Sequence, residues 1–132
     1  MSFTAERIEQ EPIILIRMIA PLHPVDDLAE LYRQTDALAA EIPGKIYRLM
    51  DWTQAQLTFD LIQELLDIQR RSAASTAPKS PRVKNHYIVA DEMGHLLIES
   101  LRQNQYGGLD VTIFSSEDEA LQQIRQAIGN EQ

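Results

Sequence analysis

Cysteine is absent from this chain of 132 residues, which excludes disulfide bonds, thiolate zinc sites, iron–sulfur clusters and thiol catalysis. Glycine is scarce, with five residues, and the glycine-rich motifs that cradle a nucleotide or a pyrophosphate do not occur. The G-x-S-x-G elbow that positions the nucleophile of many hydrolases is also missing. We therefore expect no cofactor and identify no catalytic residue.

Basic side chains are outnumbered by acidic ones, 12 against 20, and the formal net charge at pH 7 is -8. A negative chain repels phosphate backbones, so we expect no nucleic-acid partner. The longest apolar run, residues 12–16, is too short to span a bilayer, so we expect no membrane insertion. Near the N-terminus, Glu6 and Glu9 stand where a secretory signal needs an apolar core, which favours a cytoplasmic protein.

The composition that is present is that of a folded domain. Hydrophobic residues make up 44% of the chain, which is too many for a disordered protein. A chain of this length buries about two thirds of its unfolded surface when it folds. Because no repeat and no linker interrupts the sequence, it predicts a single domain over residues 1–132.

Strand and helix patterns alternate along the first half of the chain. The isoleucine-rich residues 12–20 predict a strand with Ile14, Ile16 and Met18 on one face and Arg17 on the other, which suggests that the second face is partly open. Residues 4–10 are expected to add a short hairpin strand before it. Apolar residues spaced by three and four then predict a helix from Pro24 that ends at Pro43-Gly44.

The same alternation continues to the C-terminus. The predicted elements are a strand at 45–51, a loop at 52–57, a helix from Thr58 that fades at Arg70 and Arg71, a strand at 83–90, a helix capped by Asp91 that runs to about Tyr106 and ends at Gly107-Gly108, a strand at 109–114, and a last helix capped by Ser116.

This order, (β)βαβαβαβα, predicts an α/β fold: a single mixed, mostly parallel sheet of four to five strands with four helices. Parallel sheets that are covered on both faces have continuously apolar strands. Polar residues interrupt the strands here, namely Arg48, Lys84, Asn85, His86 and Thr112. We therefore expect helices mainly on one face, and a second face that is partly polar or used for association.

Metal and phosphoryl-transfer chemistry have no pattern to support them. His23, His86 and His95 show no spacing typical of metal ligands, so we expect no metal site. A phosphorylatable receiver domain needs acids after its first strand and a lysine after its last. In this chain Pro21 and Ser115 follow the corresponding strands, so we do not expect the activity of a receiver domain.

Asp51 is the one carboxylate that we single out for acid–base or ligand chemistry. It ends an apolar strand beside Trp52, on the side where α/β sheets bind ligands. The alternative is an Asp that fixes a turn by accepting backbone hydrogen bonds, which is the commoner role. The candidate ligand-binding residues at this edge are Asp51, Trp52, Thr58, Phe59 and Tyr106, with residues 72–81 as a segment that closes the pocket.

Positive charge is concentrated in one window. Residues 68–90 contain Arg70, Arg71, Lys79, Arg82 and Lys84 and no acid, so the window carries +5 while the other 109 residues carry -13. One interpretation is a solvated surface with two arginines at a helix C-terminus. The other is a docking patch for an acidic partner, whose binding salt would weaken.

Three short segments support a resemblance to a known family: the strand Ile46 to Asp51, the turn Gln105 to Gly108, and the ending Val111 to Leu121. With the order of elements, they resemble the STAS fold (sulphate transporter and anti-sigma-factor antagonist), and more closely its uncharacterised SpoIIAA-like relatives. The resemblance implies an N-terminal hairpin followed by alternating helices and strands, and a role as a binding module.

STAS regulators that are switched by phosphorylation carry D-S-S-G or D-S-T-G at the turn into their second main helix, where a helix N-terminus stabilises the phosphate. The corresponding stretch here, Asp51 to Asp60, lacks this motif. Thr58 is its nearest hydroxyl, but Asp60 in the first turn would repel a phosphate, and a capping role explains Thr58. The resemblance therefore implies no phosphorylation switch.

Two functions remain open. The first is a non-enzymatic, cytoplasmic protein-interaction or regulatory module of STAS/SpoIIAA-like type, which forms a homodimer through the less covered sheet face or an exposed helix and binds a protein partner of acidic character. The second is a small-molecule or lipid-binding protein with a pocket at the strand ends near Trp52.

Overall fold

The computed structural model of the chain describes residues 2–71, 82–103 and 111–131. Its elements are β1 (Phe3–Arg7), β2 (Ile13–Ile19), α1 (Pro24–Ala39), β3 (Ile46–Gln54), α2 (Phe59–Arg71), β4 (Val83–Ile88), α3 (Glu92–Leu101), β5 (Val111–Phe114) and α4 (Glu117–Asn130). The strands form one sheet in the order β1-β2-β3-β4-β5, with β1 antiparallel to β2 and the others parallel. The predicted α/β class, the single mixed and mostly parallel sheet and the four helices are confirmed.

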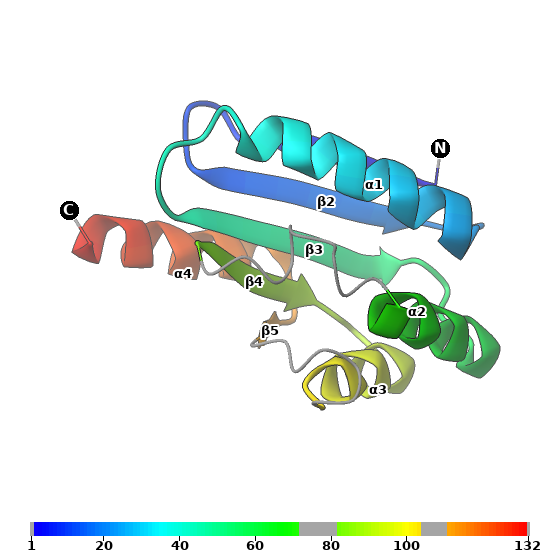
Figure 1. Cartoon of the computed structure of the whole chain (residues 1–132). Coiled ribbons are helices and arrows are strands. Elements are labelled where there is room, and N and C mark those ends of the chain that lie inside the picture. Colours follow the sequence, from blue (N-terminus) through cyan, green and yellow to red (C-terminus); the bar gives the residue numbers. More distant parts are fainter. Residues whose placement is uncertain (1, 72–81, 104–110, 132) are drawn as a thin grey trace.

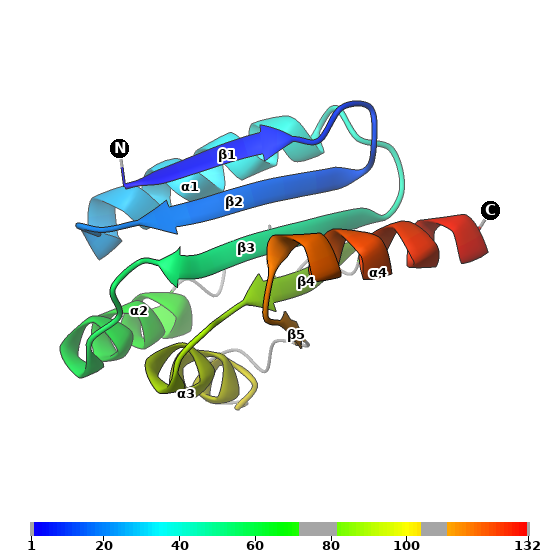
Figure 2. The same ribbon diagram turned by 180° about the vertical axis from the view of Figure 1, so that it is seen from behind.

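The strand order decides where the helices lie. Each parallel strand pairs with the next one in the sequence, so the three crossovers all move across the sheet in the same direction. Crossovers are almost always right-handed, which places α1, α2 and α3 on one face of the sheet (Figure 1). Helix α4 follows the last strand and lies on the other face (Figure 2). We call these the three-helix face and the α4 face.

The sheet has a buried core on each face. Strand β2 shows this directly, because Ile14, Ile16 and Met18 belong to the core under the three helices, while Ile13 and Leu15 belong to the core under α4. This alternation between faces is the one predicted for residues 12–20. The α4 face is only partly covered, as expected from Arg17, whose side chain is 41% exposed.

Three helix starts are set by local signals that the sequence predicts. Asp91 caps α3 by accepting a hydrogen bond from the Gly94 amide at 2.8 Å, and Ser116 caps α4 through the Glu119 amide at 3.1 Å. The Thr58 hydroxyl accepts from the backbone at the start of α2. These caps satisfy amides that have no partner within the helix, and they hold each helix start at the end of its preceding strand.

Two helices end earlier than predicted. Helix α1 stops at Ala39 and not at Pro43-Gly44, because the residue before a proline is forced out of the helical region; Ile42 is nevertheless buried. Helix α3 stops at Leu101 and not near Tyr106, because residues 102–105 are polar and supply no apolar side chain to extend its buried stripe. The Gly107-Gly108 turn lies outside the described residues.

Strand β3 is longer than predicted. It continues through Trp52 to Gln54, where a loop was expected from residue 52, because Gln54 still pairs with Ile19 of β2. Strand β4 ends at Ile88, before the predicted end at residue 90. The extension of β3 places Trp52 inside the sheet, where it is 6% exposed.

Candidate functional site

A cavity of about 30 Å³ lies between the sheet and the three helices that cover it. Alternate residues of β3, namely Arg48, Met50 and Trp52, form its floor. The remaining walls come from the three helices and β4: Leu28, Tyr32, Leu65, Tyr87, Leu97 and Leu101. We call this space the Trp52 cavity; most of its lining is apolar, and a few polar groups point into it.

Arg48 is the charged group of the cavity. Its residue is 3% exposed, and its Nη1 donates to the Asn85 side-chain oxygen at 3.3 Å and to the Tyr87 hydroxyl at 3.4 Å. Its Nε is buried, and the part of the chain that the structure describes provides no acceptor for it. None of the ion pairs among the described residues involves Arg48. A buried polar group without a partner is costly, so it marks a position that packing alone does not explain.

Trp52 supplies a second donor without an acceptor. Its indole Nε1 is buried and has no partner among the described residues, and its ring lies 6.2 Å from that of Tyr87 at a tilt of 41°. Tyr32 closes the helix side; burial raises the pKa of its hydroxyl, and the nearby positive charge of Arg48 partly opposes this. The cavity therefore presents hydrogen-bond donors to whatever enters it.

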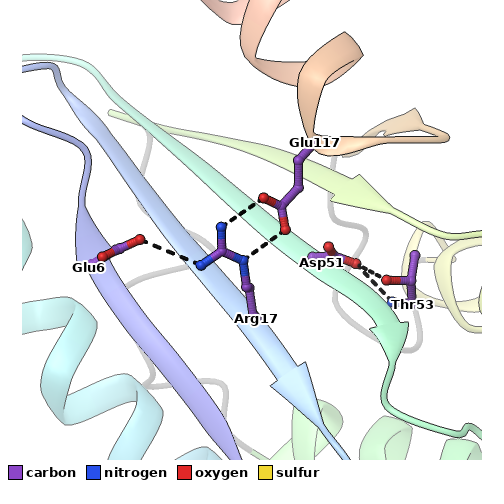
Figure 3. A network of polar contacts seen from close by, with 5 residues as sticks. All are labelled: Glu6, Arg17, Asp51, Thr53 and Glu117. Carbon is purple, nitrogen blue, oxygen red and sulfur yellow. Dashed lines mark hydrogen bonds and ion pairs between the residues drawn. The ribbon is translucent and has the colours of Figure 1, made fainter.

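Asp51 lies on the opposite side of the sheet from the Trp52 cavity, in a polar cluster on the α4 face (Figure 3). Arg17 donates through Nε and Nη2 to the two oxygens of Glu117, both at 2.9 Å, and its Nη1 lies 3.6 Å from Glu6. The Thr53 amide and hydroxyl donate to Asp51 Oδ1 at 2.9 and 2.6 Å. The cluster thus joins β1, β2 and β3 to the start of α4.

The two neighbouring carboxyl groups titrate in opposite directions. Burial raises the pKa of Asp51, a hydrogen bond with Glu117 raises it further, and the hydrogen bonds from Thr53 oppose this rise. The Arg17 guanidinium lowers the pKa of Glu117. Glu117 therefore stays ionised while Asp51 keeps its proton to a higher pH than an exposed Asp. With its Oδ1 held by Thr53, Asp51 has the turn-fixing geometry that the sequence offered as the alternative to acid–base chemistry.

The raised pKa of Asp51 predicts that Asp51→Asn stabilises the protein at neutral pH, by up to about 1 kcal/mol. Below the unfolded pKa of about 3.9, Asp51 is protonated in both states, and its favourable contribution is complete. That contribution is lost as the pH rises through the raised folded pKa of Asp51. Asn stays neutral, can still accept from Thr53 and can donate to Glu117. Urea denaturation at pH 4 and pH 7 should show the gain only at pH 7.

Asp118→Asn is the matched control, because Asp118 is an exposed acid that follows Glu117 in the first turn of α4. Removal of its charge takes a favourable interaction from the helix N-terminus and should lower stability by about 0.3–1 kcal/mol at pH 7. If Asp51→Asn instead lowered the free energy of unfolding equally at both pH values, the raised pKa of Asp51 and its hydrogen bond with Glu117 would be contradicted.

The structure separates the residues that the sequence grouped as a ligand site. Trp52 lines the cavity, while Asp51 lies on the α4 face. Thr58 caps α2, and Phe59 begins that helix with 58% of its surface exposed, so neither lines the Trp52 cavity. Tyr106 and the segment 72–81 lie outside the described residues.

The basic window is described only in part. Arg82 is exposed, and its Nη2 donates to the carbonyl of the last residue of α1 at 2.6 Å, which gives it a structural role. Lys84 is exposed on β4. Arg70 and Arg71 end α2, but their side chains, like Lys79, fall outside the described residues. The docking patch for an acidic partner therefore stays a prediction.

A second hollow, of about 220 Å³, lies on the α4 face near the C-terminal end of α4. Lys45, Tyr47, Lys84, His86 and Glu131 line it. Glu131 accepts hydrogen bonds from the Lys45 ammonium and the Tyr47 hydroxyl, both at 2.6 Å. Burial, and to a smaller extent the hydrogen bond to Glu131, raises the pKa of Tyr47 to about 12. A carboxylate of the protein already serves these donors, unlike the donors of the Trp52 cavity.

Sequence reasoning missed the functional interest of Arg48 and treated it only as an interruption of a strand. A signal was present, because Arg48 lies between Ile46 and Met50 on a face that is otherwise apolar. A charged residue in the middle of a buried strand face indicates either a buried ion pair or a ligand site.

Comparisons with models of protein families, with curated proteins and with solved structures found no match to this chain. Within the described ranges, no helix is long and apolar enough to cross a membrane. The same ranges contain no cluster of three His, Asp or Glu side chains that could hold a metal ion.

Proposed function

We propose that this chain is a small-molecule-binding module whose ligand enters the Trp52 cavity. The observation that carries the proposal is the buried indole Nε1 of Trp52, a residue that lines the cavity, because no described residue provides an acceptor for it. Buried Trp side chains normally find a partner for this group. A ligand that supplies the acceptor accounts for the arrangement, and the chain then works as a binding protein without catalytic groups at the site.

The lining and size of the cavity agree with this role. Ligand sites are mostly apolar, with a few placed polar groups that fix orientation. One water molecule needs about 10–15 Å³ of such a cavity, so about 30 Å³ has room for two waters or for a ligand group of similar size. Leu97 and Leu101 of α3 and Leu65 of α2 would contact its apolar part.

Trp52 is the only tryptophan of the chain, so its fluorescence reports on this cavity alone. We would record native mass spectra of the purified protein and compare its Trp52 emission before and after unfolding and refolding in clean buffer. A retained small molecule, and an emission change on its removal that reverses when the extract is added back, are the expected results. A bare protein whose emission does not respond to the extract or to small solutes would contradict the proposal.

Two variants of adjacent residues on α3 localise the binding. Leu97 is 1% exposed and lines the cavity, whereas Leu96 is 41% exposed and points away from it. Leu97→Phe should fill part of the cavity and weaken ligand retention, while Leu96→Phe should leave retention unchanged. Equal retention by the two variants would place the ligand elsewhere.

The second candidate is a cytoplasmic protein-interaction or regulatory module of STAS/SpoIIAA-like type, which acts as a homodimer. Its support is the exposure of Val25 and Phe59, at 65% and 58%, in the first turns of α1 and α2. Both helices begin at the edge of the sheet where the parallel strands end (Figure 1). Native mass spectrometry at micromolar concentration should show a dimer that Phe59→Ser converts to a monomer. A wild-type monomer would remove this candidate.

A further inference from the structure

We propose that the ligand of the Trp52 cavity carries a carboxylate and that this group forms an ion pair with Arg48. This inference rests on the proposed function and adds the chemical class of the ligand.

The first argument is the charge of Arg48. An arginine guanidinium carries a positive charge, and this residue is 3% exposed. The groups that accept from it, the Asn85 amide oxygen and the Tyr87 hydroxyl, are neutral and lie at 3.3 and 3.4 Å, beyond the usual range for this bond. Neutral acceptors satisfy hydrogen bonds but do not balance a charge. A buried cation needs an anion beside it, and the described residues supply none.

The second argument is the direction of the free donors. Among the described residues, both acceptors of Arg48 bind its Nη1, and none binds its Nε. The edge formed by Nε and Nη2 is the one that binds a planar carboxylate through two parallel hydrogen bonds. Trp52 also lines the cavity, and no described residue provides an acceptor for its buried Nε1.

Arg17 shows within this protein what that edge does when a carboxylate is available. Its Nε and Nη2 donate to the two oxygens of Glu117, at 2.9 Å each. The side chain of Arg17 is 41% exposed, so water also helps to solvate it. Arg48 is far more buried, so water solvates its charge less and a carboxylate partner would stabilise it more. Among the described residues, however, it is Arg17 that pairs with a carboxylate.

The third argument is size. A space of about 30 Å³ has room for about two waters, which suits a small planar group such as a carboxylate. A water molecule in the same place would accept hydrogen bonds but would bring no negative charge. The leucine side chains around it suit a short hydrocarbon chain attached to the carboxylate. A small aliphatic carboxylic acid therefore matches charge, donors and lining together.

Butyrate and butyramide test the charge directly, because they have nearly the same shape and differ in charge. Sodium butyrate would replace sodium chloride at constant ionic strength and pH 7, and butyramide would be added to the chloride buffer. Trp52 emission and the melting temperature would be recorded for the full chain. We expect butyrate to change the emission saturably and to raise the melting temperature with its concentration, and butyramide to do neither.

Two substitutions separate the ion pair from general salt effects. Arg48→Met should weaken butyrate binding at least about tenfold, and Arg48→Lys should also weaken it because an ammonium lacks the planar edge. Arg33→Met is the control: Arg33 is 68% exposed, pairs with Glu30 on α1 and is not among the residues that line the cavity, so the variant should bind butyrate as the wild type does.

The outcomes distinguish this inference from the function on which it rests. Equal binding of butyrate and butyramide, full butyrate binding by Arg48→Met, or a butyrate response no larger than that of chloride would overturn the carboxylate assignment and leave a small-molecule cavity in place. A protein that carries no retained molecule and responds to none of these solutes would overturn both.

Discussion

Replacing Arg48 with methionine should raise the free energy of unfolding of the ligand-free protein by about 1–4 kcal/mol. Most large changes in a core lower stability. Here the change removes a charge that is 3% exposed and has only two long hydrogen bonds to neutral groups. Methionine fills a comparable length of the cavity floor with an apolar and adaptable side chain. The gain arises because the variant no longer desolvates a guanidinium for which the described residues provide no counter-ion.

Urea denaturation followed by circular dichroism measures this effect, in a chloride buffer from which retained ligand has been removed. Arg33→Met removes the same charge from an exposed site and should change stability by less than about 0.5 kcal/mol. A clear loss of stability in Arg48→Met would mean that the guanidinium is well matched inside the protein, and the argument for an anionic ligand would lose its basis.

If Arg48→Met is more stable than the wild type, Arg48 destabilises the ligand-free protein at a site where it would bind the ligand. Proteins often keep a destabilised group at a site whose function needs it. A ligand that supplies the missing charge would then return the lost stability on binding. The bound wild type should therefore approach the stability of ligand-free Arg48→Met.

The second large effect concerns Trp52, for which the size of the substituted side chain decides the outcome. Trp52→Ala should lower the free energy of unfolding by about 3–5 kcal/mol, because it empties the floor of the cavity at a residue that is 6% exposed. Trp52→Phe keeps an aromatic ring against Tyr87 and should cost about 1–2 kcal/mol. Within the described ranges the indole N–H has no acceptor, so its loss leaves no buried group there unsatisfied.

Circular dichroism is the appropriate probe for both Trp52 variants, since neither retains the tryptophan fluorescence. Trp52→Phe should remain folded at room temperature and should bind butyrate more weakly than the wild type, because one donor is missing. If Trp52→Phe lost as much stability as Trp52→Ala, the N–H group would have to contribute to the fold itself. The cavity would then be a structural feature and not a ligand site.

The sequence was sufficient to predict the fold because its signals are local. The alternation of Ile14 and Ile16 with their neighbours places the two faces of β2, and the caps at Asp91 and Ser116 place two helix starts. A crossover helix between consecutive strands implies that the strands are parallel. The predictions were wrong at the ends of elements, because pairing with distant residues decides where a strand ends. Gln54, for example, belongs to β3 because it pairs with Ile19 of β2.

The site was less predictable because its contacts join distant parts of the chain. Glu117 lies in the first turn of α4, where an acid is favourable, yet its oxygens accept from Arg17, a residue 100 positions away. Trp52 was placed near a ligand, but in a loop beside Asp51, whereas the longer β3 puts the two on opposite faces of the sheet. The contact between Arg17 and Glu117, and the pairing with β2 that lengthens β3, both join residues far apart in the sequence. Neither produces a pattern within a short window of sequence.

Helix α4 has a consequence for synthesis of the protein on the ribosome. It is the only helix over its face among the described elements, and it follows all five strands in the chain (Figure 2). Synthesis proceeds from the N-terminus, so the three-helix side can assemble while Ile13, Leu15 and Leu49 on the other side still face solvent. A nascent chain paused before α4 therefore exposes an apolar sheet face that chaperones can bind and that can drive aggregation.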